Sequence, residues 1–466
     1  MKFVNVLFVV LLYCTHLSAQ VTLPNNLYFT HIGVEDGLCQ NTVCCILQDH
    51  LGFIWLGTKD GLTRYDGYRF RVFKHDAADP MSIGNNFIRV LYEDADGLIW
   101  IGTNVGVYIY NPETENFRKF DVVTERGDVI SREVSSIKCD SPGDLWIGVN
   151  WQGVFRYDRR DESLELYEPV PGDTTSLSSV HVWDLCFDGD GNLWVGSQNG
   201  GLDRYDRETD RFVRHRLKGL SDVSRIVLDK QNQLLLGTMK DGLFSFNPYM
   251  GTCQPLLLDS GHKDLFVRAI FVRNSREVVV GTENGIYIYD CVTRKTRHVN
   301  QELGNPYSLS CKAVYSIYCD KEGALWIGTY FGGVNYLPPS SSLIFDKFYP
   351  IGHSDRLSGK AVREFVRDEN GIIWIGTEDQ GLNRFDPVSG KFTHYNSRNS
   401  GLSCDNVHGL CVDGDRLYIG TFFGGFNIMD LKTNEIVALG SQMLPDDSVF
   451  SIFRDHDGRI WVGLTY

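Results

Sequence analysis

Acidic residues recur at one kind of place in this chain, just before a glycine and a short apolar run. Examples are Asp94 to Gly97, Asp188 to Gly191 and Asp455 to Gly458, each of the form Asp-x-Asp-Gly. Carboxylates at alternate positions bind calcium in EF-hand loops, but such a loop spreads its ligands over about twelve positions and ends in a glutamate. Asp and Gly also suit hairpin turns, and strand-like runs follow here at once. We therefore favour turns over metal binding and predict no metal site and no cofactor.

A few polar residues could be assembled into a catalytic site. Hydrolysis or elimination at a sugar needs paired carboxylates, or a set of His, Tyr and Arg side chains. Glu35, Asp36, Asp184 and His181 are candidates. However, Asp36 and the glycine after it are also a turn pair, and Asp184 lies in a predicted strand. We predict no catalytic residue in this segment and keep a polysaccharide lyase or glycosidase as an alternative.

Aromatic side chains in certain loops form a second group that could bind a ligand. The loops Asn150 to Gly153, Tyr330 to Gly333 and Phe422 to Gly425 combine aromatic residues with amides or glycines. Such groups suit contacts to sugars or proteins. The alternative is that they cover loops or contact a second domain. The predicted ligand-binding residues are Trp151, Trp183, Tyr330, Phe331, Phe422 and Phe423.

These residues are positioned by a repeat that runs through the whole chain. The tripeptide Trp-x-Gly recurs, and its glycines and those of its degenerate copies are separated by 41 to 48 residues. A fixed period of this length indicates a repeat architecture. The glycines stand at positions 57, 102, 148, 196, 237, 281, 328, 376, 420 and 463.

One repeat contains four strand-like segments, best seen from Asn86 to Phe120. A β-rich run is followed by an Asp-x-Asp-Gly turn, a second run that contains Trp100, another turn, a third run and a short polar fourth. Four antiparallel strands per unit of about 40–45 residues are typical of a β-propeller blade. A series of βαβ units would need helical patterns of 10–15 residues between strands, and none is found. We predict an all-β fold with Trp as a core anchor between blades.

Ten repeats are too many for one ring, because propellers close with four to eight blades. We predict one seven-bladed propeller over residues 20–342, followed by the start of a second propeller, truncated after three repeats, over residues 343–466. The segment Pro338 to Ser342 is the predicted boundary between the two propellers. Either Leu27 to Ile32 or Phe345 to Tyr349 is expected to complete a blade made mostly of another part of the chain. The chain is expected to be a fragment of a longer protein.

The amino terminus indicates export. Lys2 precedes the apolar run Phe3 to Tyr13, and Leu17 to Ala19 resembles a signal-peptidase site, so residues 1–19 are predicted to be a signal peptide or an N-terminal anchor. The predicted location is periplasmic or extracytoplasmic. The net charge of −14 and the absence of a basic run make nucleic acid an unfavourable direct partner.

The opening of the first repeat resembles a known family. Val34 to Val43, Gly52 to Thr58 and Gly61 to Gly67 are similar to the beginning of the periplasmic sensor in hybrid two-component systems. The repeats resemble the two-component regulator propeller repeat, most clearly at Gly191 to Asp206 and Gly371 to Asp386. They are weakest in the fifth and sixth copies, where Leu and Val replace Trp.

The resemblance implies a larger protein than the chain itself. It implies two seven-bladed propellers, a small β-sandwich, a membrane helix, a histidine kinase, a receiver and often a DNA-binding module. The present chain would hold the first propeller and three repeats of the second. Such sensors are associated with glycan fragments, so the resemblance implies an oligosaccharide signal.

Together these observations predict a sensory, non-catalytic ectodomain. The predicted function is to detect a glycan-derived signal and pass it across the membrane to a phosphorelay that controls transcription. We expect a homodimer, with membrane attachment through a missing C-terminal part or the N-terminal anchor. A secreted propeller that serves as a scaffold for protein interactions is the other alternative, beside the enzyme.

Overall fold

The computed structural model describes residues 22–24, 26–217, 220, 222–257, 265–339, 347–348, 356–440 and 444–465. Within these ranges the structure consists of antiparallel sheets with a single 3-10 turn, η2 (Val34–Asp36). The predicted signal peptide or anchor lies outside the described residues. The chain divides into two compact units, Met1–Ile344 and Phe345–Tyr466.

The first unit contains seven four-stranded sheets, which we number as blades 1 to 7 in chain order. Blade 1 is β2 (Val43–Gln48), β3 (Ile54–Thr58), β4 (Gly61–Tyr65) and β5 (Phe70–Phe73). Blade 2 is β6 (Ile88–Glu93), β7 (Ile99–Thr103), β8 (Gly106–Asn111) and β9 (Asn116–Lys119). Blade 3 is β10 (Val134–Cys139), β11 (Leu145–Val149), β12 (Gly153–Asp158) and β13 (Ser163–Tyr167). Blades 4 and 5 are β14 (Val182–Phe187), β15 (Leu193–Ser197), β16 (Gly201–Asp206) and β17 (Arg211–His215); and β18 (Arg225–Leu228), β19 (Leu234–Gly237), β20 (Leu243–Asn247) and β21 (Thr252–Leu257). Blade 6 is β22 (Val267–Val272), β23 (Glu277–Thr282), β24 (Gly285–Asp290) and β25 (Thr296–Val299).

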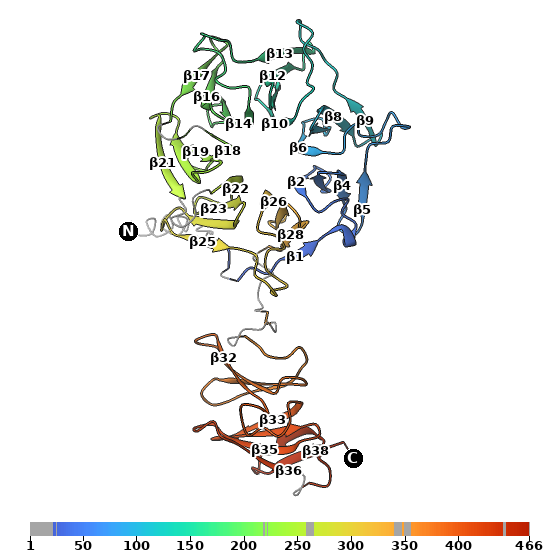
Figure 1. Cartoon of the computed structure of the whole chain (residues 1–466), viewed down its shortest axis with the longest axis vertical. Coiled ribbons are helices and arrows are strands. Elements are labelled where there is room, and N and C mark those ends of the chain that lie inside the picture. Colours follow the sequence, from blue (N-terminus) through green and yellow to red (C-terminus); the bar gives the residue numbers. More distant parts are fainter. Residues whose placement is uncertain are drawn as a thin grey trace, which may run out of the picture. The chain divides into compact units, whose positions relative to one another are not determined.

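Blade 7 joins the two ends of the ring. Its strands β26 (Val314–Cys319), β27 (Leu325–Thr329) and β28 (Val334–Leu337) are completed by β1 (Thr30–Ile32), which pairs antiparallel with β28. Of the two segments expected to complete a blade from a distance, the first therefore does so, and most of the second lies outside the described residues. Figure 1 shows the seven sheets around one axis, with the first strand of each blade nearest the centre. The predicted seven-bladed ring is confirmed.

The repeated glycine lies in the second strand of each blade and lets the first strand of the next blade pack closely against it. A Cβ atom on Gly102 would lie 2.6 Å from Cγ1 of Val134 in the next blade, and one on Gly328 would lie 2.8 Å from Cγ1 of Val43. The second of these contacts joins blade 7 to blade 1. Any larger residue would push neighbouring blades apart at the centre of the ring.

The repeated tryptophan fills the space between blades. Trp55 lies 5.0 Å, ring to ring, from Tyr110 of the next blade, and Trp146 lies 4.7 Å from Tyr205. Both indoles are completely buried. In blades 5 and 6, Leu235 and Val279 take this position and are buried as well. The fold therefore tolerates an aliphatic residue at the anchor, as the regular sheets of those two blades demonstrate.

The second unit repeats the same sheets. Blades 8 and 9 are β29 (Val362–Arg367), β30 (Ile373–Thr377), β31 (Leu382–Asp386) and β32 (Lys391–Tyr395); and β33 (Val407–Asp413), β34 (Arg416–Thr421), β35 (Gly425–Asp430) and β36 (Ile436–Gly440). Blade 10 consists of β37 (Val449–Arg454) and β38 (Ile460–Leu464).

Candidate functional site

The Asp-x-Asp-Gly turns have a structural partner. In blade 1 the indole Nε1 of Trp55 donates to Oδ2 of Asp49 at 2.8 Å, while Oδ1 accepts from the backbone N–H of Phe53. The same indole–carboxylate bond occurs in every blade that keeps the tryptophan. Within the described residues, no three His, Cys, Asp or Glu side chains group as metal ligands. The first Asp of each turn thus positions the core anchor.

The acidic candidates for catalysis also make structural contacts. Asp36 accepts from the backbone N–H of Gly33 at 2.8 Å. Asp184 accepts from Ser136 Oγ in the preceding blade and from the N–H of Ile226 in the following blade, at 2.9 and 3.0 Å. These bonds join neighbouring blades around the axis.

The predicted inner-loop aromatics occupy one end of the propeller. In most blades the first residue of the loop between the second and third strands donates its backbone N–H to the residue before the first strand. Tyr330 donates to Ala313 O in blade 7, and Phe422 donates to Asn406 O in blade 9. The loop and the entry to the first strand therefore meet on one face of each unit. We call this the loop face; the Asp-x-Asp-Gly turns lie at the opposite end of each first hairpin.

Aromatic rings and cations alternate on the loop face of blades 6, 7, 1 and 2. Lys59 Nζ lies 4.2 Å from the centre of the Tyr330 ring and donates to its hydroxyl at 3.1 Å. Tyr330 contacts both Tyr315 and Phe331, at 5.1 and 4.2 Å between ring centres. Phe331 is 70% exposed. We call the whole set the cation–aromatic belt: Phe266, Arg268, Tyr315, Tyr330, Phe331, Lys59, Phe87 and Arg89.

Trp151 lies on the loop face of blade 3. Its indole is 65% exposed and packs edge-on against His181 of blade 4, with 4.1 Å between ring centres. Its backbone has a φ of 70°, a left-handed conformation that a bulky residue rarely adopts. Such strain costs about 1–3 kcal/mol and accumulates at functional sites. Asn199, at the same loop position of blade 4, has a φ of 59° and is a residue type that tolerates this conformation.

Trp183 lies in β14, the first strand of blade 4, and Figure 1 shows this strand next to the ring centre. It is the extra residue of a bulge between Val182 and Asp184. Its side chain is partly buried, and its indole Nε1 is buried without an acceptor among the described residues. Bulges often re-aim a side chain next to a functional site.

The bulge recurs at a constant place in the sequence. In most repeats, the bulged residue stands 13 positions before the repeat glycine, as Arg89 does before Gly102 and Arg268 before Gly281. We did not identify these arginines from the sequence, although a charged residue inside an apolar first strand at fixed spacing was a usable signal. The bulged residues of the first unit are Cys44, Arg89, Ser135, Trp183, Arg268 and Tyr315.

The second unit has its own aromatic cluster. Phe422 stacks on His408 at 5.2 Å and contacts Phe423 at 4.4 Å. Phe423 is 73% exposed and, like Trp151, has a positive φ, here 71°. Burial and the nearby charge of Arg363 lower the pKa of His408, which keeps this imidazole neutral at pH 7. The cluster thus presents a neutral aromatic surface.

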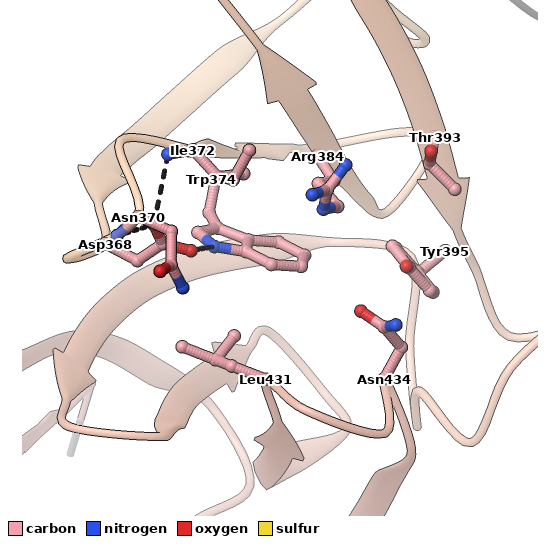
Figure 2. A pocket seen from close by; sticks show the side chains of 9 residues that line it. All are labelled: Asp368, Asn370, Ile372, Trp374, Arg384, Thr393, Tyr395, Leu431 and Asn434. Atoms are coloured by element: carbon pink, nitrogen blue, oxygen red, sulfur yellow. Dashed lines mark hydrogen bonds between the residues drawn. The ribbon is translucent and has the colours of Figure 1, made fainter.

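A pocket of about 420 Å³ lies in the second unit, on the side of the Asp-x-Asp-Gly turns. Figure 2 shows Trp374 between Asp368, to which its indole donates, and a space bordered by Arg384, Tyr395 and Asn434. In blade 2 the corresponding space beside Trp55 holds Tyr110, whereas blade 9 has Met429 at that register. The pocket thus lies between blades 8 and 9, next to the core cluster in which Met429 takes the place of a tyrosine ring.

The long loops that enter the first strands have a structural role. Leu177, Leu309 and Leu402 of these loops are all buried, and the following serine donates its N–H to a third-strand side chain. These acceptors are Asp203, Asn335 and Asn427. This recurring geometry explains the length of these loops.

Six stretches of the chain match the family model described as two component regulator propeller: residues 37–60, 82–105, 176–199, 308–331, 356–379 and 443–466. Each of the first five runs from an entering loop to the loop that follows the second strand of the same blade. The chain carries two-component regulator propeller repeats.

A histidine kinase of Formosa agariphila is similar to a short part of this regulator propeller chain. The two are 39% identical over 59 residues, which make up 13% of this chain and 4% of that protein. The chain thus corresponds to a small part of the relative that it matches.

Solved structures share the fold. The extracellular domains of two hybrid two component systems from B. thetaiotaomicron superimpose with TM-scores of 0.68 and 0.59, at 23% and 20% identity. Both matches cover 94% of this chain, and 70% and 64% of the respective structures. Virginiamycin B lyase from Staphylococcus aureus matches 67% of this chain and 99% of its own, with a TM-score of 0.51 and 12% identity. Propellers of similar fold thus include an enzyme, and the fold alone does not decide function.

In this regulator propeller five of the six predicted site residues form three groups, and Trp183 lies apart from them in the bulge of β14. Tyr330 and Phe331 belong to the cation–aromatic belt, and Trp151 pairs with His181, a residue that the sequence indicated only as a candidate for catalysis. Phe422 and Phe423 form the cluster of the second unit. Among the described residues, no ring contact joins Trp151 to the belt, so the loop face of the ring presents separate aromatic surfaces around the axis. Among the described residues, no helix is long and apolar enough to cross a membrane.

Proposed function

We propose that the chain is the extracytoplasmic sensor portion of a hybrid two-component histidine kinase. The signal is a glycan fragment bound on the loop face of the propeller. Binding is passed across the membrane to a phosphorelay that controls transcription. The regulator propeller repeats and the short match to a histidine kinase support the signalling role. The exposed aromatic residues support the chemical class of the signal.

The main support for a ligand-binding surface on the loop face is the conformation and exposure of Trp151. A tryptophan with most of its surface in water and a left-handed backbone gains little packing and retains strain. A structural role does not explain it, because Asn199 makes the same loop turn in blade 4 at lower cost. Indole faces stack on the apolar faces of sugar rings and leave hydroxyls free for amide partners. Asn150 supplies such an amide next to it, whereas the amide of Gln152 is bonded to the backbone of Val129, Ser131 and Arg132.

The test is to measure binding of a panel of oligosaccharides to the purified chain by calorimetry, with Trp151→Asn as the variant. We expect one glycan class to bind the unmodified chain and at least a tenfold loss of affinity in the variant. Tyr68→Ala is the matched control, because Tyr68 is 93% exposed in the turn before β5, away from the loop face. Equal affinity of all three proteins would contradict the proposed surface, and breakdown of the oligosaccharide would indicate an enzyme.

The signalling step needs a partner, and we propose a second copy of the full-length protein. A ligand shifts an equilibrium between two arrangements only by its difference in affinity for them, typically about 1–3 kcal/mol. Site-specific cross-linking of the whole protein in cells, with and without the inducing glycan, tests this step. A ligand-dependent change in cross-linking between two copies is expected, and a monomer under both conditions would contradict it.

A further inference from the structure

Cations gather at the centre of the first ring. Arg89, Arg225 and Arg268 all lie on first strands, β6, β18 and β22, which surround the axis in Figure 1. Arg225 donates from Nε to the backbone oxygen of Arg268 at 2.7 Å, so it reaches from blade 5 into blade 6. Lys59 enters the same region from blade 1. Blades 1, 2, 5 and 6 therefore each contribute a cation around the axis.

The electrostatic influence of these groups on one another agrees with their position on neighbouring first strands. Burial lowers the pKa of the Arg225 guanidinium, and the charges of Arg268 and Arg89 lower it further, against the opposing effect of Asp184. Burial raises the pKa of the Cys44 thiol to about 11, while the charges of Arg89, Lys59 and Arg268 oppose that rise. Part of the Arg225 surface nevertheless remains accessible to solvent. Arg225 therefore lies deep in the ring and still has surface that a small solute can reach.

The carboxylates nearby balance only some of this charge. Arg89 pairs with Glu133 at 3.2 Å, and Arg268 pairs with Glu283 at 2.6 Å. Among the described residues, no carboxylate oxygen lies within 4 Å of the Arg225 guanidinium. Buried charges are normally paired, because desolvation is costly. The two bonds of Arg225 to backbone oxygens, Arg268 O and Ser224 O, use only part of its five N–H donors.

We propose that Arg225, with Arg89 and Arg268 beside it, forms a binding site for an oxyanion at the centre of the first ring. The shared chemistry is that of a carboxylate or sulfate, for which the planar guanidinium offers paired donors. The source is either an acidic group on the saccharide signal or a free inorganic anion. The first source rests on the proposed function, whereas the site itself does not.

The test uses the purified chain and three probes at constant ionic strength: sodium sulfate, trigalacturonic acid and the methyl ester of trigalacturonic acid, in which the carboxylates are neutralised. Calorimetry and the thermal unfolding midpoint are measured for the unmodified chain, Arg225→Gln and Arg225→Lys. Arg118→Gln is the matched control, because Arg118 is exposed on the outer strand β9. Sulfate also stabilises proteins by exclusion from their surfaces, and that effect is common to all variants.

We expect a saturable effect of sulfate or trigalacturonic acid on the unmodified chain and on Arg118→Gln. Affinity is expected to fall at least tenfold in Arg225→Gln, with partial retention in Arg225→Lys. Binding of trigalacturonic acid but not of its ester identifies a sugar carboxylate, and binding of sulfate alone identifies a free anion. No saturable binding of either anion to the unmodified chain would overturn the site, even if Arg225→Gln did not fold. Binding of the neutral ester that depends on Trp151 but not on Arg225 would overturn this inference and leave the proposed function intact.

Discussion

The two units contain the same hairpin in different surroundings. In the first unit, Trp146 donates to Asp140 at 3.1 Å and is completely buried. In the second unit, Trp461 donates to Asp455 at 2.8 Å, yet 59% of its surface is exposed. Trp374, which has the next blade against it, is 1% exposed.

The hairpin determines the orientation of the tryptophan, whereas the ring determines its burial. The indole–carboxylate bond joins residues six positions apart, so each hairpin can form it alone. Burial of the same indole requires the third strand of the following blade. For Trp146 this strand is β16, which places Tyr205 beside the indole. The bond sets the orientation of the tryptophan, and the neighbouring blade supplies the burial that stabilises it.

The largest expected effect is therefore a difference between two identical substitutions. Trp146→Ala removes a buried aromatic side chain and should lower the free energy of unfolding by about 3–5 kcal/mol. Trp461→Ala removes a mostly exposed one and should cost less than about 1 kcal/mol. Hydrogen exchange, read at the peptides of each hairpin, measures the two effects separately. Similar losses at both positions would show that burial by the next blade contributes little to the stability of the hairpin.

Much of this fold is predictable from the sequence because the period is directly visible. The repeat glycines give the blade count, and the turns give the strand order within each blade. Leu235 and Val279 weaken the pattern in blades 5 and 6 without changing the sheets, because packing between blades needs only an apolar side chain there. The seven-bladed ring was therefore predicted correctly.

The candidate site was predictable only in part. Loop aromatics such as Trp151 stand out because they depart from the repeat. Arg89, Arg225 and Arg268 lie 43 or more positions apart, and only closure of the ring brings their charges together. The strain at Trp151 is likewise a property of backbone geometry that residue types do not reveal.

A second prediction compares Asp203 of blade 4 with its counterparts Asn335, Asn383 and Asn427. All four accept the N–H of a serine in the entering loop. Burial raises the pKa of Asp203 from 3.8 to about 6, so the folded state holds a proton that the unfolded state releases between these values. The protonated Asp203 therefore contributes fully to the free energy of unfolding below pH 4. This contribution is lost as the pH rises towards 6, and above that pH the free energy of unfolding changes no further through Asp203. The loss is about 3 kcal/mol at most.

Asp203→Asn should remove this loss, because an amide accepts the same bond without charge. We expect the variant to be more stable than the unmodified chain by about 1–3 kcal/mol at pH 8, with a smaller difference at pH 4. Urea unfolding at several pH values measures it, and Asn383→Asp is the reciprocal variant, expected to destabilise the second unit at pH 8. A variant that is less stable at pH 8 would contradict the burial argument.

A third prediction concerns the pocket beside Trp374. Met429→Tyr places a phenol where blade 2 has Tyr110, whose hydroxyl lies 3.4 Å from the guanidinium of Arg64. Arg384 holds the position of Arg64 in blade 8. Filling the pocket should stabilise the second unit by about 0.5–1.5 kcal/mol. Met429→Leu, which leaves the space open, is the control and should gain nothing; a loss in the tyrosine variant would show that the pocket is not the space left by a missing ring.

The smallest expected effect, and the most informative about function, is that of Trp151→Asn on stability. The variant loses the edge-on contact with His181, worth about 0.5–1.5 kcal/mol, and relieves backbone strain of about 1–3 kcal/mol. Stability should therefore stay the same or rise by about 1 kcal/mol, although a large aromatic side chain has been removed. Phe423→Asn should behave alike in the second unit, because Phe423 shares the exposure and the positive φ.

Chemical denaturation monitored by circular dichroism measures the stability of both variants. A loss above about 1 kcal/mol would show that these aromatics hold the blades together, whereas an unchanged or raised stability leaves ligand contact as the reason for a strained tryptophan on the loop face.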